Sequence, residues 1–308
     1  MRVALLTCAN VTNDRRAARD FLGRRNGADR PARLVRGSWG TMNPMSTTDR
    51  KIRLGIQIQP QHADYRQIRD AVLRAEDSGV DIVFNWDHFF PLNGDPDGKH
   101  YECWTMLGAW AEQTERVEIG ALVTGGGYRN PDLLADMART VDNISDGRLI
   151  LGIGGGWFEK DYDQYGYEFG TPGTRLNLLG EYLPRIAARL DVLNPPPARP
   201  IPVLIGGGGE RKTLRYVARH ASIWHAFGDL SVMQRKSAIL AEHCASIGRD
   251  PAEIEHSTSA PRGGTGAGDQ LVDAGVTLFT IGVSGPDYDL SAVAQWVAWR
   301  DARNSDRG

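Results

Sequence analysis

From residue 51 onwards the sequence alternates short apolar runs with longer amphipathic stretches, and this alternation restricts the possible folds more than any other feature. Lys51–Gln59 carries apolar residues at every second position, which is typical of a half-buried strand. Tyr65–Ser78 then places its apolar residues on one face of a helix. Together the two segments predict one strand–helix unit.

The same pattern recurs until eight strand–helix units are complete. Strands that alternate with helices cannot pair through tight turns, so the predicted sheet is parallel. Eight units match a single-domain (β/α)8 TIM barrel, which typically has about 250 residues. An open, doubly wound sheet normally has a glycine motif after its first strand, where this chain has Gln57–Pro60. The predicted strands are Lys51–Gln59, Asp81–Phe84, Val117–Val123, Arg148–Ile153, Ile201–Ile205, Ser222–His225, Ile254–Ser259 and Val276–Ile281, and the predicted helices are Tyr65–Ser78, Cys103–Gln113, Pro131–Ser145, Arg175–Leu190, Arg211–His220, Ser231–Ile247, Asp269–Ala274 and Asp289–Arg303.

The segment before the barrel has a different composition. Residues 1–44 contain nine arginines, three acidic residues and little apolar periodicity, so this segment buries too little surface to offset its ordering entropy. We therefore predict an extension over residues 1–44 and one barrel domain over residues 45–308. The extension is either a disordered natural segment, a targeting peptide, or an artefact of gene prediction with translation starting at Met45.

Composition excludes several classes of function. No stretch approaches the roughly 18 uncharged apolar residues that cross a bilayer, so we expect no membrane association. A formal net charge of −2 is far from the basic balance of a nucleic-acid-binding protein. The three cysteines include no CxxC pair, which excludes a disulfide scaffold and a zinc ribbon and favours a cytoplasmic location.

The strongest candidate for chemistry follows the second predicted strand. In such a barrel, active sites lie at the C-terminal ends of the strands. There the chain has Trp86, Asp87 and His88, followed by further aromatic residues. An imidazole among aromatic rings and next to a carboxylate suits proton transfer near neutral pH. The alternative is that His88 only satisfies a buried hydrogen bond.

Three glycine-rich segments lie at other strand ends. Gly125–Gly127 follows the third strand, Gly154–Gly156 the fourth, and Gly206–Gly209 the fifth. Without side chains, a flat or phosphorylated ligand can approach the backbone N–H groups. Gly206–Gly209 also precedes a predicted helix, whose N-terminus favours an anion. The alternative is that these glycines only allow tight turns.

Other catalytic classes find no support in the sequence. No Asp, Glu and His residues have the spacing of metal ligands, and no GxSxG motif is present, so we predict neither a metal site nor a covalent nucleophile. The acidic residues Glu159, Asp161 and Asp163 lie in a long connection after Trp157. We expect this connection to fold as a lid or a short helix.

The run Tyr128–Trp157 resembles the core signature of the luciferase-like flavin and deazaflavin oxidoreductases. The resemblance continues through Asp161 to Glu181 and covers about residues 52–303. The segment Trp86–Phe89 is similar to the coenzyme F420-dependent branch. Members of this class are (β/α)8 barrels.

The resemblance implies an oxidoreductase that transfers a hydride between coenzyme F420, an 8-hydroxy-5-deazaflavin, and a small organic substrate. It further implies a homodimer. His88 corresponds to the proton donor or acceptor near the reactive face of the ring, with Asp87 beside it to fix its orientation. We expect the substrate to lie under Trp86 and Trp157.

The resemblance also assigns the cofactor-binding residues. It places a non-proline cis peptide, which supports the ring, at Ala121–Leu122, and it places the cofactor tail on the glycine loop after the fifth strand. Gly125–Gly127 departs from the usual polar loop, and no lysine pair for a sugar phosphate is evident, so glucose 6-phosphate is not carried over as substrate. Two alternatives are an FMN-dependent monooxygenase and a non-catalytic cofactor-binding protein of the same fold. The predicted cofactor-binding residues are Ala121, Leu122, Thr124, Gly154, Gly155, Gly156, Gly206, Gly207, Gly208 and Gly209.

Overall fold

The computed structural model describes residues 50–306, which lie within a single unit of the chain, Gly37–Gly308. The predicted extension over residues 1–44, and the choice among its alternatives, lie outside the described residues. None of the described helices combines the length and the apolar character needed to cross a membrane.

The described strands and helices follow the predicted alternation closely. The strands are β1 (Arg53–Ile58), β2 (Ile82–Asn85), β3 (Glu118–Ala121), β4 (Thr124–Gly125), β5 (Leu149–Gly154), β6 (Val203–Gly206), β7 (Ile223–His225), β8 (Glu255–Ser259) and β9 (Val276–Val283). The helices are α1 (Tyr65–Asp77), α2 (Cys103–Gln113), α3 (Pro131–Ile144), α4 (Glu159–Tyr165), α5 (Pro172–Leu190), α6 (Thr213–His220), α7 (Leu230–Ala245), the 3-10 helix η1 (Pro251–Glu253), α8 (Thr265–Asp273) and α9 (Ser291–Ser305).

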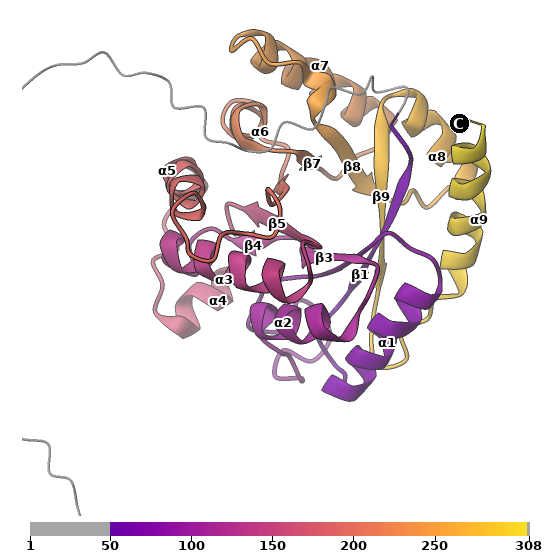
Figure 1. Ribbon diagram of the computed structural model, residues 1–308, viewed down its shortest axis with the longest axis horizontal. Coiled ribbons are helices and arrows are strands. Elements are labelled where there is room, and N and C mark those ends of the chain that lie inside the picture. Colours follow the sequence, from indigo (N-terminus) through magenta and orange to yellow (C-terminus); the bar gives the residue numbers. More distant parts are fainter. Residues whose placement is uncertain (1–49, 307–308) are drawn as a thin grey trace, which may run out of the picture. The chain divides into compact units, whose positions relative to one another are not determined.

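All strand pairs of the sheet are parallel, and the sheet closes on itself. β1 pairs with β9 on one side and with β2 on the other, and both β3 and β4 pair with β5. β3 and β4 are two halves of one interrupted strand, so the barrel has eight strand positions. Figure 1 shows the helices arranged around these strands. The predicted (β/α)8 barrel is therefore confirmed, and the interruption of its third strand is the main departure.

Helix starts are set by local capping groups. Asn130 accepts hydrogen bonds from the Asp132 and Leu133 N–H groups, and Pro131 occupies the first helical position of α3, as predicted. Helix α5 begins at Pro172, three residues before the predicted start, because the Thr171 side chain caps it. Conversely, α6 begins at Thr213 rather than at Arg211.

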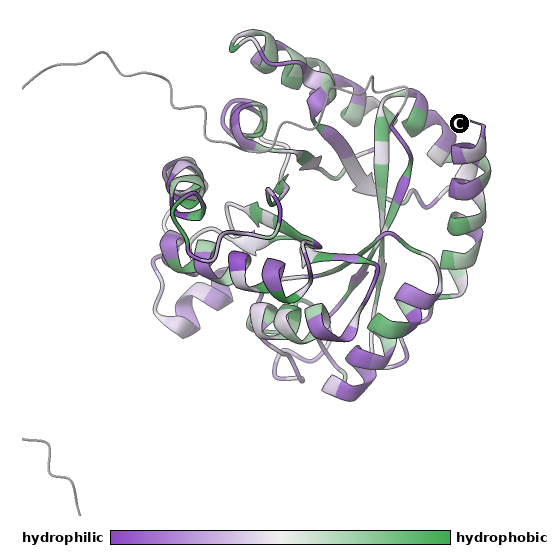
Figure 2. Ribbon diagram, in the orientation of Figure 1, coloured by the Kyte–Doolittle hydropathy of each residue, from purple (hydrophilic) through white to green (hydrophobic). Residues whose placement is uncertain are grey.

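The barrel wall separates two apolar clusters. A large cluster lies between the strands and the surrounding helices, and a smaller one fills the barrel interior. The hydropathy colouring shows mainly apolar strands, whereas β8 is hydrophilic along most of its length (Figure 2). Polar side chains therefore line part of the interior. The interior cluster consists of Ile82, Phe84, Leu122, Ile150, Leu204, Ile223 and Leu278.

An ion-pair network lies at the N-terminal end of the barrel interior. The Arg53 guanidinium binds Glu255 through two hydrogen bonds of 2.5 and 3.2 Å and also pairs with Glu118. Arg199 pairs with Glu118 as well. The Glu255 side chain is only 2% exposed, so it depends on Arg53 for compensation of its charge.

We predict that Arg53→Met lowers the free energy of unfolding by about 3–5 kcal/mol, because it leaves the Glu255 carboxylate buried without its cation. The matched control is Arg69→Met, which removes the exposed pair with Asp70 and changes stability by at most about 1 kcal/mol. Urea denaturation followed by circular dichroism measures both. Equal destabilisation by the two variants would contradict this role of Arg53.

Candidate active site

The loops after β2, β4 and β5 meet at the C-terminal end of the barrel around one buried carboxylate. His88 Nδ1 lies 2.7 Å from Asp161 Oδ2, and the His88 side chain is 10% exposed whereas that of Asp161 is fully buried. Asp161 belongs to α4, the short helix expected in the connection after Trp157. The structure thus joins two residues that are 73 positions apart.

Asp161 accepts hydrogen bonds from two further donors. The Phe89 N–H donates to its Oδ1 at 3.0 Å, and the Tyr128 hydroxyl donates to its Oδ2 at 2.7 Å. Burial and the Asp161 carboxylate raise the pKa of Tyr128, so its hydroxyl stays protonated and donates. Since Asp161 accepts from every partner, His88 donates through Nδ1, and neutral His88 has its lone pair on Nε2.

The expectation that Asp87 orients His88 is wrong. Asp87 forms a bidentate ion pair with Arg129, at 2.5 and 3.1 Å, and Arg129 also pairs with Glu102 at the start of α2. Burial raises the pKa of the Asp87 carboxyl, and Arg129 opposes that shift. Neighbouring side chains of an extended chain point to opposite sides, so Asp87 faces α2 while His88 faces the barrel mouth.

Aromatic rings surround His88 on several sides. Trp86, Trp157 and Phe158 lie edge-to-face against its imidazole, with ring centroids 6.2, 5.7 and 5.6 Å away. The Trp86 indole N–H donates to His100 Nε2 at 3.2 Å. Burial lowers the pKa of His100 to about 4, so His100 is neutral and can accept this hydrogen bond. Trp157 is 62% exposed, so much of its surface beside His88 is accessible.

The non-proline cis peptide lies at Leu122–Val123, so the predicted position at Ala121–Leu122 is wrong by one residue. The peptide before it still belongs to the sheet, because the Leu122 N–H donates to the Asn85 carbonyl of β2. The cis bond therefore falls in the gap between β3 and β4. The Gln57 side chain donates to the Leu122 carbonyl at 2.8 Å.

Several of the predicted cofactor-binding residues contact other residues of the chain. Thr124 Oγ1 accepts the Trp104 indole N–H at 3.0 Å on the outer side of the barrel. At Gly156, φ is +75°, and a Cβ would lie 2.1 Å from the Tyr162 hydroxyl. A Cβ at Gly154 would lie 2.8 Å from Val123. Close packing of the chain against itself therefore favours glycine at these two positions.

The loop after β6 differs from the other two glycine loops. Within the described residues, the backbone N–H groups of residues 208–212 donate to no acceptor. Lys236 of α7 lies beside this loop and donates to the Gly208 carbonyl at 2.6 Å. Several unpaired N–H groups next to a lysine form a cradle suited to an anion. The glycines can be recognised in the sequence, but Lys236 cannot, because it lies one strand further along the chain.

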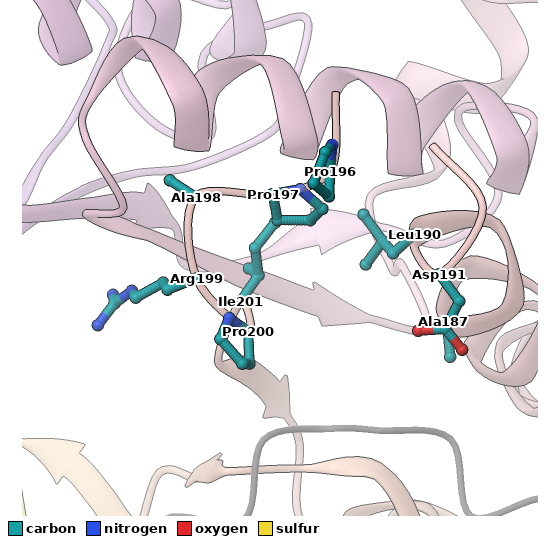
Figure 3. Close-up of a pocket in the computed structure, with 9 residues that line it drawn as sticks. All are labelled: Ala187, Leu190, Asp191, Pro196, Pro197, Ala198, Arg199, Pro200 and Ile201. Atoms are coloured by element: carbon teal, nitrogen blue, oxygen red, sulfur yellow. The ribbon is translucent and has the colours of Figure 1, made fainter. Parts of the chain in front are cut away.

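A cavity of about 320 Å³ lies at the opposite end of the barrel (Figure 3). It is lined by the last turn of α5 and by the segment 196–201 that leads into β6. It has no contact with the strand ends that carry His88. Among residues 50–306, no group of three or more His, Cys, Asp and Glu side chains is arranged to hold a metal ion.

The fold and this constellation define a (β/α)8 barrel with a buried histidine–aspartate pair at its C-terminal mouth. A model of the luciferase-like monooxygenase family matches residues 48–262. The chain belongs to this family.

Individual relatives show how far the similarity extends. The chain is 28% identical over 180 residues to an F420-dependent glucose-6-phosphate dehydrogenase of Amycolatopsis mediterranei. The aligned residues cover 51% of this chain and 52% of the relative. To an uncharacterised protein of Mycobacterium tuberculosis it is 28% identical over 183 residues, which cover 52% of this chain and 64% of that protein, so the chain matches less than two thirds of the length of these relatives.

Two solved structures share the fold. One is an F420-dependent secondary alcohol dehydrogenase in complex with an F420–acetone adduct, with a TM-score of 0.70, 16% identity, and coverage of 81% of this chain and 98% of that one. The other is a type II Baeyer–Villiger monooxygenase of Pseudomonas putida in complex with FMN, with a TM-score of 0.57, 16% identity, and coverage of 68% and 67%.

Proposed function

We propose that this protein is a coenzyme F420-dependent oxidoreductase acting on a small organic substrate, with His88 as the proton donor or acceptor. The observation that carries the proposal is the His88–Asp161 pair at the barrel mouth. Asp161 holds the His88 imidazole, whose side chain is 10% exposed, in a fixed orientation beside the largely exposed Trp157, which supports a role in proton transfer. When bound, a deazaflavin supplies hydride transfer, which no amino-acid side chain provides.

The residues at the mouth fit such a cofactor. The unpaired N–H groups of residues 208–212, together with Lys236, would hold the phosphate of its tail. Leu122 and Val123 lie between β3 and β4 and are apolar, so a flat ring could rest on them. Gly154 and Gly206 leave room for the Val123 side chain, because a Cβ at either position would collide with it.

His88 would move the proton that accompanies the redox step. A carbonyl carbon that gains a hydride leaves an oxygen that needs a proton, and an alcohol that loses a hydride releases one. Within the described residues, His88 Nε2 has no hydrogen-bond partner, whereas its Nδ1 is held by Asp161. Nε2 is therefore the atom that gives or takes the proton, and Asp161 is a positioning residue.

The FMN-dependent monooxygenase remains the second candidate. It is favoured by the shared fold with the FMN-bound Baeyer–Villiger enzyme. The same apolar surface and anion cradle suit FMN, whose ring and single phosphate resemble those of the deazaflavin. The homodimer and the cytoplasmic location expected from the sequence stay predictions.

A parallel titration with deazaflavin, FMN and NADPH tests the cofactor assignment. We expect perturbation of the visible deazaflavin absorption at micromolar protein, with weaker or no response to FMN and NADPH. Preferential binding of FMN would replace the first proposal by the second. Tight deazaflavin binding without turnover of any aldehyde, alcohol, enone or quinone would support the third alternative, a non-catalytic cofactor-binding protein.

Substitutions at the pair test the role of His88. We predict that His88→Ala lowers kcat by about 10²–10⁴ and leaves the dissociation constant for deazaflavin nearly unchanged, because a general acid–base group contributes about this much to the rate. Asp161→Asn should also lower kcat. The control Asp163→Asn lies on the same helix with an exposed side chain and should behave as wild type. Full turnover by His88→Ala would exclude the assignment.

A further inference from the structure

A second histidine lies at the barrel mouth, on the last residue of β7. Successive side chains of a strand point to opposite sides. Trp224 faces the helices, so His225 and Ile223, which belongs to the interior cluster, lie on the other side of β7. Its side chain therefore points into the barrel, one layer above Ile223. Its register neighbours are Gly206 on β6 and Ser257 on β8.

Only one of the two nitrogens of the His225 imidazole has a hydrogen-bond partner within the described residues. Nδ1 lies 2.9 Å from the Ser257 hydroxyl oxygen, and His225 and Ser257 are 3% and 0% exposed. Nε2 is buried without a hydrogen-bond partner in the described part of the chain. Gly206, on the other side, has no side chain that could supply one. A buried polar nitrogen without a partner lowers the stability of the folded protein.

The aromatic ring beside this imidazole is not part of the packed core. The Phe227 ring stands perpendicular to the His225 ring, with centroids 5.3 Å apart, and Phe227 is 77% exposed. An exposed phenyl group can rotate away without disturbing the barrel. Burial also lowers the pKa of His225 to about 4, so this imidazole is neutral near pH 7 and recognises a neutral partner rather than an anion.

We infer that His225 Nε2 hydrogen-bonds a neutral carbonyl or N–H group on the heterocyclic ring of the bound cofactor. The inference rests on the proposed function, because it assumes that the cofactor ring lies on Leu122 and Val123 and that the cofactor tail lies on the loop after β6. Leu122 belongs to the same interior cluster as Ile223, which lies one layer below His225, and the tail loop follows β6, whose Gly206 is paired in register with His225. Both deazaflavin and FMN carry an imide with the required donor and acceptor.

Four variants separate this hydrogen bond from general packing. His225→Gln places an amide near the position of Nε2, whereas His225→Asn places one near Nδ1, and His225→Phe removes both polar atoms. The matched control is His256→Phe. His256 also has a buried, unpartnered Nε2 and a pKa of about 4, but it packs against Trp224 and Ser237 on the outer side of the barrel.

The measurement is the dissociation constant for deazaflavin, from absorbance or fluorescence titration of each purified variant, with thermal unfolding as a check of folding. We expect His225→Phe and His225→Asn to bind about ten- to hundredfold more weakly, because one buried hydrogen bond is lost. His225→Gln and His256→Phe should stay within about threefold of wild type.

Wild-type affinity in His225→Phe and His225→Asn would overturn the inference while leaving the proposed function intact. Equal weakening of His225→Gln and His225→Asn would also overturn it, since the position of Nε2 would then not matter. If the wild-type protein binds neither deazaflavin nor FMN, the proposed function fails, and the inference fails with it.

Discussion

The site depends on one buried carboxylate, that of Asp161. It accepts hydrogen bonds from His88, from the Phe89 backbone and from Tyr128, and so ties the loops after β2 and β4 to helix α4. Hydrogen bonds to an ionised acceptor are about twice as strong as neutral ones, and a buried carboxylate without donors would be very costly. Asp161 therefore fixes where His88 lies and which of its nitrogens faces the barrel mouth.

The two ends of the barrel differ in how their polar groups are paired. At the N-terminal end, Arg53 neutralises Glu118 and Glu255 inside the barrel, an arrangement that serves stability. At the C-terminal end, several polar atoms have no hydrogen-bond partner among the described residues: Nε2 of His88, Nε2 of His225 and the N–H groups of residues 208–212. This division agrees with the general rule that barrels of this type carry chemistry at the C-terminal strand ends.

The alternation of strands and helices could be predicted from the sequence because it depends on local periodicity. The same holds for the start of α3 at Pro131 and for the placement of His88 after the second strand. The partner of His88 could not be found locally, because Asp161 lies 73 residues away and only the closed barrel brings the two together. The side chain closer in sequence, Asp87, was the wrong choice for a physical reason: consecutive residues of an extended segment face opposite sides. Lys236 could not be found locally either, because it lies in α7, far along the chain from the loop that it contacts.

The most direct test of this account is the tautomer of His88, measured by nitrogen NMR of histidine-labelled protein under alkaline conditions, where imidazoles are neutral. A His88→Gln sample assigns the signal. The account predicts a protonated Nδ1 and an unprotonated Nε2, because the Asp161 carboxylate can only accept. A proton on Nε2 with a bare Nδ1 would contradict it, since Asp161 would then not hold the ring in the orientation on which the proposed chemistry rests.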